Sequence, residues 1–147
     1  MSKDIQPSAP PQAFQIPIDV RFRDLDGLGH INNAVYHSYI EQARTVWLNE
    51  SSLMTSAGKR IPRIPVILAR TEMDFLQQGS FSDKITVSAW ISRVGGKSFD
   101  SDYEVRAEGK GVITRARAVL VWFDYEKNVS IPIPPQERAW LQAQLAN

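Results

Sequence analysis

The chain has 147 residues, with 17 lysines and arginines against 16 aspartates and glutamates, so its formal net charge is +1, and 43% of its residues are hydrophobic. This length suits one compact domain that buries a sizeable core. The balanced charge gives no electrostatic footprint for nucleic acid or for an anionic membrane surface. Because the chain contains no cysteine, disulfides, thiolate zinc sites and a cysteine nucleophile are excluded.

The N-terminal segment differs in composition from the rest of the chain. Residues 1–13 hold three prolines among serine, glutamine and alanine, and lack the apolar stretch of a secretory signal. Such a composition buries too little surface to offset its ordering entropy, which predicts a flexible tail followed by a single domain over residues 14–147. With no apolar run of about 18 residues, the default expectation is a soluble cytoplasmic protein that does not bind membranes.

Alternating apolar and polar residues predict most of the strands. The first run extends from Phe14 to Phe22 and includes Pro17, which has no N–H to donate, so it is expected at a sheet edge. Four further runs occupy residues 67–75, 85–91, 99–107 and 112–123. Glycine-bearing turns separate these four runs, which favours an antiparallel meander. Residues 49–63 are predicted to form a connector, and the sequence gives little to specify its structure.

One long helix is predicted from Val35 to Trp47. At about 100° per residue its apolar side chains fall within an arc of roughly 140°, and Asn32 or Asn33 is a suitable N-cap. A second, short helical pattern covers residues 136–145. The order of elements predicts an α+β fold in which an antiparallel sheet of about five strands wraps around the long helix. We expect another copy of the chain to complete the outer face and the uncovered part of the helix.

Residues capable of chemistry are concentrated just before the long helix. Asp24, Asp26, His30, Asn32 and Asn33 lie within ten positions of one another. Unpaired N–H groups and the helix dipole at such a helix start can polarise a carbonyl group or hold an oxyanion. A nearby aspartate can activate water as a general base or attack as a nucleophile.

This segment resembles the signature of a known family. Residues 24–44 match every fixed position of D-x-D-x-x-x-H-[VI]-N-N-x-x-Y-x-x-Y-x-E-x-A-R, the usual form of that signature in hot-dog-fold acyl-CoA thioesterases of the 4-hydroxybenzoyl-CoA thioesterase-like group. The resemblance implies hydrolysis of an acyl-CoA to a free acid and CoA. It also implies a homodimer or homotetramer in which two sheets join edge to edge, with the active sites at the subunit interface.

The resemblance further implies roles for particular residues. Asp26 matches the catalytic carboxylate, a general base or nucleophile, and the backbone N–H of Asn33 is expected to point at the thioester oxygen. Glu41 matches a carboxylate that serves some relatives as a base or water-holder. Lys97 and Ser98 resemble a segment that helps some relatives to bind the CoA nucleotide. No metal or redox cofactor is expected, because a thioester is already activated.

One departure from the plant acyl-carrier-protein thioesterases concerns the histidine. Those enzymes carry asparagine two places after the catalytic aspartate and use the following histidine, whereas this chain has Leu28 there and retains His30. A mechanism based on an Asn–His pair is therefore disfavoured, and His30 is expected to have a structural or polarising role.

Simpler explanations stand beside these roles. Asp24 is expected to be an exposed turn residue or a partner of Arg23, and Asn32 and Asn33 are expected to be caps. A surface ion pair with Arg44 is the commoner explanation for Glu41, and Lys97 is most simply a turn lysine. Three other functions stay open: an acyl-carrier-protein thioesterase, a non-catalytic acyl-CoA binder, and a hydratase or dehydratase. The acyl group preferred is also open.

Overall fold

The computed structural model describes residues 8–51, 55–56, 59–60 and 64–145, so most of the predicted tail lies outside the described residues. Its elements, in chain order, are β1 (Phe14–Ile18), the 3₁₀ helix η1 (Phe22–Asp24), α1 (Val35–Glu50), β2 (Thr55–Ser56), β3 (Lys59–Arg60), β4 (Val66–Phe75), β5 (Ile85–Val94), β6 (Ser98–Ala107), β7 (Gly111–Asp124), β8 (Val129–Ser130) and α2 (Pro135–Ala143). No helix in these ranges is long and apolar enough to cross a membrane.

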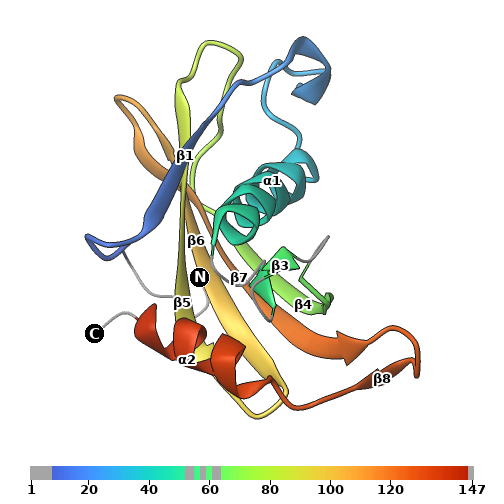
Figure 1. The fold of residues 1–147 in the computed structure, drawn as a ribbon. Coiled ribbons are helices and arrows are strands. Elements are labelled where there is room, and N and C mark those ends of the chain that lie inside the picture. The colour runs from blue at the N-terminus through green and yellow to red at the C-terminus, as the bar shows by residue number, and fades with distance from the viewer. Residues whose placement is uncertain (1–7, 52–54, 57–58, 61–63, 146–147) are drawn as a thin grey trace.

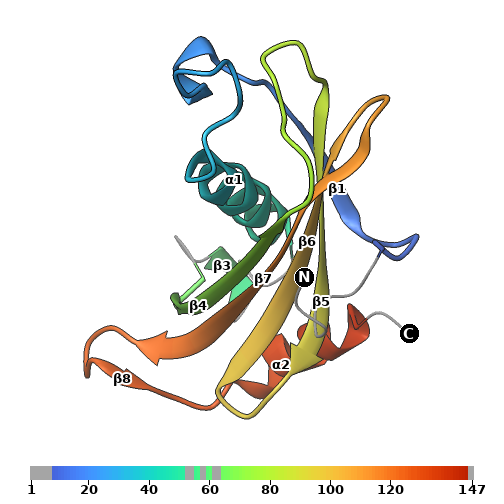
Figure 2. The same cartoon turned by 180° about the vertical axis from the view of Figure 1, so that it is seen from behind.

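The main sheet is antiparallel and has the strand order β1-β5-β6-β7-β4, with β8 paired to β7. It curves around α1, which lies across its concave side (Figures 1 and 2). The predicted α+β hot-dog arrangement is confirmed, and β1, which contains Pro17, lies at an edge as expected. The strand β4 forms the opposite edge and pairs only with β7 among the described residues. The prediction of a meander over all four runs is therefore wrong for the first of them, and the meander consists of β5, β6 and β7.

The core lies between α1 and the concave face of the sheet. Tyr36, Tyr39, Ile40 and Ala43 of the helix are buried there. They pack with the inward residues of the central strands: Ile85, Val87, Ala89, Tyr103, Val105, Ala116 and Ala118. Farther along the same face, α2 places Leu141 in a second cluster with Ile91, Phe99 and Leu120. The apolar arc predicted for the long helix thus provides its buried face.

The first strand ends earlier than its alternating pattern predicts. Pairing with β5 stops where Ile18 faces Ile85, the first residue of β5, so no ladder remains for a longer strand. Phe22, expected on the buried face of that strand, starts η1 and is 82% exposed. Two more departures concern the 49–63 connector, which contains the short pair β2 and β3, and β8, which the sequence pattern did not indicate.

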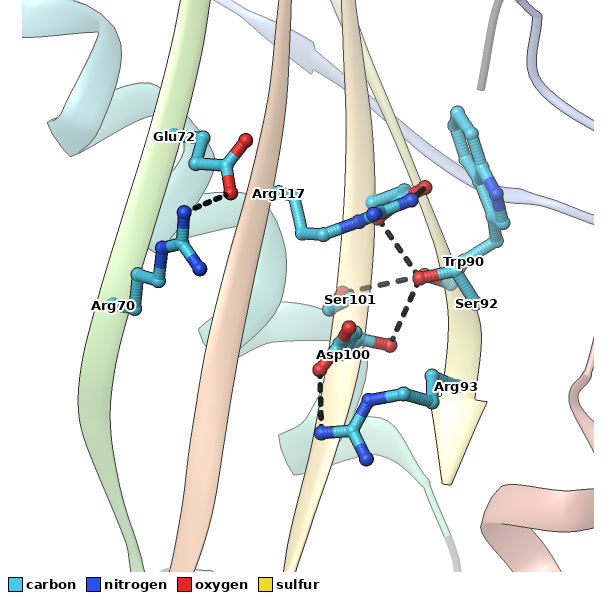
Figure 3. Close-up of polar contacts among 9 residues, drawn as sticks. Arg70, Glu72, Trp90, Ser92, Arg93, Asp100, Ser101 and Arg117 are labelled. Atoms are coloured by element: carbon cyan, nitrogen blue, oxygen red, sulfur yellow. Dashed lines mark hydrogen bonds and ion pairs between the residues drawn. The ribbon is translucent and has the colours of Figure 1, made fainter. Parts of the chain in front are cut away.

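The convex face of the sheet carries buried charges. Asp100, Asp102 and Glu104 alternate along the outer side of β6, with relative exposures of 8%, 0% and 1%. Arg117 of β7 donates from Nε and Nη2 to the two carboxylate oxygens of Asp102 at 2.7 and 3.0 Å, and Arg93 of β5 donates to Asp100 at 2.8 Å. Figure 3 shows these arginines meeting the middle strand from both sides. The acidic residues are therefore neutralised within the chain itself.

Candidate active site

The segment between β1 and α1 is anchored by Asp24. Its buried carboxylate accepts hydrogen bonds at Oδ2 from the backbone N–H of Arg21, at 2.9 Å, and from the Tyr39 hydroxyl, at 2.8 Å. The prediction of an exposed turn residue or a partner of Arg23 is therefore wrong. Burial and the hydrogen bond to Asp24 raise the pKa of Tyr39, so this hydroxyl stays protonated and keeps donating.

Asp26 lies in the exposed turn that follows. Its Oδ1 accepts the backbone N–H groups of His30, at 3.0 Å, and of Leu28, at 2.8 Å. These two bonds lower the pKa of the Asp26 carboxyl below its ordinary value, so the group is ionised at neutral pH. Its other oxygen, Oδ2, accepts no hydrogen bond from the described residues, which leaves it open to water or substrate.

The loop between β4 and β5 contacts the turn that carries Asp26. The backbone N–H of Ile31 donates to the carbonyl of Gly79 at 2.8 Å, and His30 forms a β-bridge with Ser80. The contact requires glycine, because a Cβ at position 79 would lie 2.6 Å from Ile31 Cδ1 and 2.8 Å from the Tyr36 hydroxyl oxygen. The Asp26 turn therefore rests on the loop between β4 and β5.

The helix start differs in detail from its prediction. Ala34 occupies the N-cap position and has no side-chain cap, so the prediction of Asn32 or Asn33 there is wrong. Asn32 instead closes the turn before the helix, accepting the N–H of Ala34 at its side chain, at 3.0 Å, and the N–H of Val35 at its carbonyl, at 2.9 Å. The N–H of Asn33 has no acceptor in the described part of the chain.

These pieces meet at a cavity of about 460 Å³. Its lining includes three of the predicted site residues, Asp26, His30 and Asn33, so the structure brings them together. The rest of the lining is Ile31, Asn32, Tyr36, Phe75, Leu76, Gln77 and Gln78. The segment 75–78 was not predicted, because its place beside the Asp26 turn depends on the Gly79 contact, and no local pattern signals that contact. A cavity of this size suits a small-molecule ligand.

Glu41 lies elsewhere in the chain. Together with His37 and Arg44, it lines a separate cavity of about 90 Å³ between α1 and the sheet. The predicted ion pair with Arg44 is wrong: no ion pair joins them in the described residues, and Arg44 turns towards the sheet and donates to the Tyr103 hydroxyl at 3.3 Å. Within one chain, Glu41 therefore does not share the cavity of Asp26.

Lys97 and Ser98 lie at the opposite end of the sheet from Asp26. Lys97 is exposed in the turn between β5 and β6, and Ser98 Oγ accepts a hydrogen bond from Arg93 at 2.9 Å. The loop that supports Asp26 precedes β5, whose ten residues span about 30 Å. One chain therefore does not bring Lys97 and Ser98 to its own Asp26.

The donor set offers no metal centre within the described ranges. No group of three or more His, Asp or Glu side chains there could hold a metal ion. The larger cavity itself offers one ionised carboxylate with an open oxygen, an N–H without an acceptor among the described residues, and the helix start.

A family model for the Thioesterase-like superfamily matches residues 20–143. The chain belongs to this superfamily. The matched range contains both the Asp26 turn and the whole of the main sheet except β1. This thioesterase is accordingly a thioester hydrolase with the hot-dog fold.

Curated relatives and solved structures agree with that assignment. The long-chain acyl-CoA thioesterase FadM of Escherichia coli is 24% identical over 130 residues, covering 88% of this thioesterase and 97% of FadM. A chloroplastic acyl-acyl carrier protein thioesterase of Arabidopsis thaliana, ATL3, is 28% identical over 120 residues, and the alignment spans 80% of this chain but only 63% of ATL3. A Thermus thermophilus thioesterase crystallised with coenzyme A and Zn is 31% identical, with a TM-score of 0.76 and coverages of 88% and 92%.

Proposed function

We propose that this thioesterase hydrolyses an acyl-CoA thioester at the Asp26 cavity. The observation that carries the proposal is the meeting of an ionised carboxylate with a free oxygen and the acceptor-less N–H of Asn33 in one cavity. FadM and the CoA-bound Thermus thermophilus protein support the choice of acyl-CoA as substrate. The thioester carbonyl would lie at the helix start, with its oxygen towards Asn33 and its carbon within reach of Asp26.

Two routes fit this arrangement. In the first, Asp26 takes a proton from water while the water oxygen bonds to the thioester carbon; the C–S bond then breaks, and the CoA thiolate leaves and takes up the proton. In the second, an Asp26 oxygen attacks the carbon and expels the thiolate, and water hydrolyses the resulting mixed anhydride. In both routes negative charge develops on the carbonyl oxygen, where the Asn33 N–H and the helix dipole stabilise it.

Thiol release from a panel of short, long and aromatic acyl-CoAs tests the proposal. We expect turnover by the wild type and a loss of about 100-fold or more in Asp26→Asn, which keeps the shape and removes the base. Asp19→Asn, at an exposed aspartate outside the cavity, is the matched control. Absence of thiol release from every CoA ester, or full activity in Asp26→Asn, would contradict the proposal.

Isotope labelling separates the two routes. In a single turnover in ¹⁸O-water, the general-base route places the label in the product acid alone. The nucleophilic route, with water attacking the aspartyl carbon of the anhydride, leaves the label in the Asp26 carboxylate. Mass spectrometry of the peptide that contains Asp26 reads the difference.

We also propose that the working unit is a homodimer joined through β4. This ten-residue edge strand exposes Ile67, Leu68 and Phe75 by 42%, 44% and 45%. A long, apolar edge with unpaired backbone groups is a template for pairing with another chain. Because Phe75 lines the Asp26 cavity, a second copy at this edge would lie beside the active site. Further pairing of dimers would give the homotetramer.

The homodimer would also explain why Glu41, Lys97 and Ser98 lie away from Asp26 within one chain. Two-fold pairing of β4 with its copy is antiparallel, so the Phe75 end of one strand lies beside the Val66 end of the other. The partner's Glu41 and the partner's Lys97 would then approach the end of the sheet that carries Asp26. We therefore assign Glu41, Lys97 and Ser98 to the site across the interface, with Lys97 and Ser98 on the CoA nucleotide.

Mixed dimers test this assignment. If Lys97 acts across the interface, a dimer of one Asp26→Asn chain and one Lys97→Ala chain contains one site with both residues intact, and that site shows the wild-type KM for acyl-CoA. If Lys97 acts within its own chain, the only site with Asp26 lacks Lys97, and the KM is that of the Lys97→Ala homodimer. Equal KM values for wild type and Lys97→Ala would contradict any role in CoA binding.

A specific observation also favours acyl carrier protein as the carrier. ATL3, whose name specifies acyl-acyl carrier protein, matches this chain at 28% identity. Kinetic competition decides between the carriers: free CoA inhibits an enzyme that binds the CoA nucleotide, and fails to inhibit one that recognises the carrier protein. We expect inhibition by CoA.

A further inference from the structure

We infer that the side-chain amide of Gln78 donates a second hydrogen bond to the thioester oxygen, opposite the backbone N–H of Asn33. The inference rests on the proposed function, since it requires that the thioester lie at the Asp26 cavity. It adds a catalytic residue from the loop between β4 and β5, outside the segment that carries Asp26 and Asn33. The carbonyl oxygen would then lie between two donors from two different parts of the chain.

A single N–H leaves part of the developing charge without a donor. The oxygen of a carbonyl group has two lone pairs, and the N–H of Asn33 would occupy one of them. Charge that develops on this oxygen is best stabilised by donors that are already in place around it. A second donor has to come from the lining of the same cavity, and Gln78 is part of that lining.

Backbone pairing places Gln78 beside the helix start. His30 and Ser80 form an antiparallel β-bridge, and the hydrogen bond between positions 31 and 79 keeps the same register. Continued by one more residue, this register sets Gln78 across from Asn32, one position before Asn33. Residues that face each other in an antiparallel pair have Cα atoms about 4.5–5.5 Å apart. Gln78 therefore reaches the cavity from the wall that faces the helix start.

The backbone around Gln78 is held in place before any substrate binds. The carbonyl of Gln78 accepts a hydrogen bond from Nζ of Lys110 at 3.2 Å. The preceding residue, Gln77, donates from Nε2 to the carbonyls of Lys110 and Val112, both at 3.0 Å. The following residue, Gly79, is fixed by its contact with Ile31. A donor on such a backbone needs little rearrangement when charge develops on the substrate.

The side-chain amide of Gln78 remains available for a ligand. No described residue forms a hydrogen bond with this amide, and the residue is exposed at the cavity. The amide of Gln77 is different, because both of its N–H groups are used by the two backbone carbonyls. Of the two glutamines, only Gln78 can therefore donate to a substrate.

The other polar side chains of the lining are less well placed. His30, Asn32 and Asn33 belong to the same short segment as the N–H of Asn33, so they approach the carbonyl oxygen from the same side. The hydroxyl oxygen of Tyr36 is buried and out of contact with solvent, although the residue lines the cavity. Gln78 is thus the polar side chain that approaches from the opposite wall with free donors.

Thiol release by two variants of similar size tests the donor role. Gln78→Met removes the amide, and we expect kcat to fall by about tenfold or more. The KM should stay close to the wild-type value, because the bond strengthens as charge develops in the transition state. Gln78→Glu keeps an acceptor oxygen but replaces the donor by a carboxylate, which repels the oxyanion, so its loss should be at least as large.

Gln142→Met and Gln142→Glu, at an exposed position of α2, are the matched controls and should keep the wild-type kcat. Activity close to wild type in Gln78→Glu, with a loss in Gln78→Met, would show that Gln78 accepts a hydrogen bond from the attacking water. That result, or wild-type kcat in Gln78→Met, overturns the donor role and leaves the thioesterase proposal standing.

Infrared spectroscopy detects the hydrogen bond without turnover. The probe is a ¹³C-labelled ketone analogue of acyl-CoA in which a methylene group replaces the sulfur, so that it binds and is not hydrolysed. Hydrogen bonds lower the stretching frequency of its carbonyl group. We expect a lower frequency on wild type and Gln142→Met than on Gln78→Met, a difference that a purely structural role of Gln78 would not produce.

The spectra also separate this inference from the proposed function. Equal frequencies on wild type and Gln78→Met overturn the donor role. If the wild type hydrolyses no acyl-CoA, the proposed function fails, and the frequencies of the bound ketone still decide whether Gln78 donates to the carbonyl. Failure of the ketone to bind, together with no hydrolysis, overturns both.

Discussion

The Tyr39 hydroxyl, on the second turn of α1, donates a 2.8 Å hydrogen bond to Oδ2 of Asp24, two residues before Asp26. The helix therefore holds the turn that carries the candidate catalytic carboxylate. The turn is positioned from one side by this bond and from the other by the contact of Ile31 with Gly79. Disturbing either contact should affect activity without replacing Asp26, His30 or Asn33.

Replacing Tyr39 by phenylalanine should lower both stability and turnover. The change removes a donor to a buried carboxylate, which is expected to reduce the free energy of unfolding by about 1–3 kcal/mol. The kcat should fall as well, because the Asp26 turn loses its link to the helix. Urea denaturation and thiol release measure the two effects.

Tyr125→Phe is the matched control for that change. Tyr125 donates to the carbonyl of Val66 at 2.7 Å, but it is 47% exposed, and Val66 is at the opposite end of β4 from Phe75, which lines the Asp26 cavity of the same chain. Its loss should leave kcat unchanged. Wild-type kcat in Tyr39→Phe would show that the Asp24 contact does not position Asp26.

Gly79→Ala should be strongly unfavourable. The added Cβ would meet Ile31 and Tyr36 at distances that real Cβ atoms do not show, so either the loop between β4 and β5 or these two buried side chains must shift beside the Asp26 turn. We expect a loss of about 1–3 kcal/mol in stability and a clear loss of activity. Gly96→Ala, where nothing lies within 4 Å of the new Cβ, should be close to neutral in thermal unfolding.

The buried pair of Asp102 and Arg117 gives a third prediction. Arg117→Met leaves the fully buried Asp102 carboxylate without its bidentate partner, which should destabilise the fold by about 3–5 kcal/mol. The double variant with Asp102→Asn should recover part of that loss, because no unpaired charge remains. Arg70→Met, which breaks the exposed pair with Glu72, should cost about 1 kcal/mol or less. Equal losses for the two arginine variants in denaturant titrations would refute this account.

The pH profile of kcat/KM provides a fourth prediction. Hydrogen bonds from His30 and Leu28 lower the pKa of Asp26, so the carboxylate stays ionised to a lower pH than an ordinary aspartate does. The acid limb of the profile should therefore lie below about pH 4. A limb between about pH 6 and 7 would instead identify a histidine as the essential base.

The lowered pKa of Asp26 also predicts how folding stability depends on pH. Because the pKa of folded Asp26 is lower than that of the unfolded chain, its contribution to stability is present above the unfolded pKa and is lost as the pH falls through the folded pKa. In Asp26→Asn this part of the pH dependence should disappear. Unfolding measured from neutral to strongly acidic pH compares the two proteins.

The parts of the fold that depend on local pattern could be predicted from the sequence. Alternation located the four long strands β4 to β7, and the helical arc located α1, because each pattern shows which side of the element is buried. Alternation did not give the strand order: only β5, β6 and β7 form the predicted meander, and β4 pairs with β7 at the edge. The end of β1 could not be predicted in this way, since it is determined by where its neighbour begins at Ile85. Asp100, Asp102 and Glu104 have the alternation of an exposed face, and their burial depends on partners that the pattern does not signal, including Arg93 of β5 for Asp100 and Arg117 of β7 for Asp102.

The candidate site also contains some residues that local sequence predicts and others that only tertiary packing brings there. Asp26, His30 and Asn33 lie within eight positions, so their common cavity follows from one compact turn before a helix. Phe75 and Gln78 reach that cavity through tertiary packing that their own sequence does not signal. The inward path of Arg44 is a further case: spacing on α1 favoured a partner three residues away, but Tyr103 lies on a strand 59 positions later.

The two edge strands of the main sheet differ in their capacity to pair with another chain. At β1 the exposed strand is five residues long and contains Pro17, which contributes no N–H, whereas β4 offers ten residues. Chains can therefore add readily at one side only. In the proposed homodimer, two-fold pairing would cover β4 in both molecules and leave only the short, proline-containing β1 at each outer edge. The sheet would then end at two copies instead of extending into a fibre.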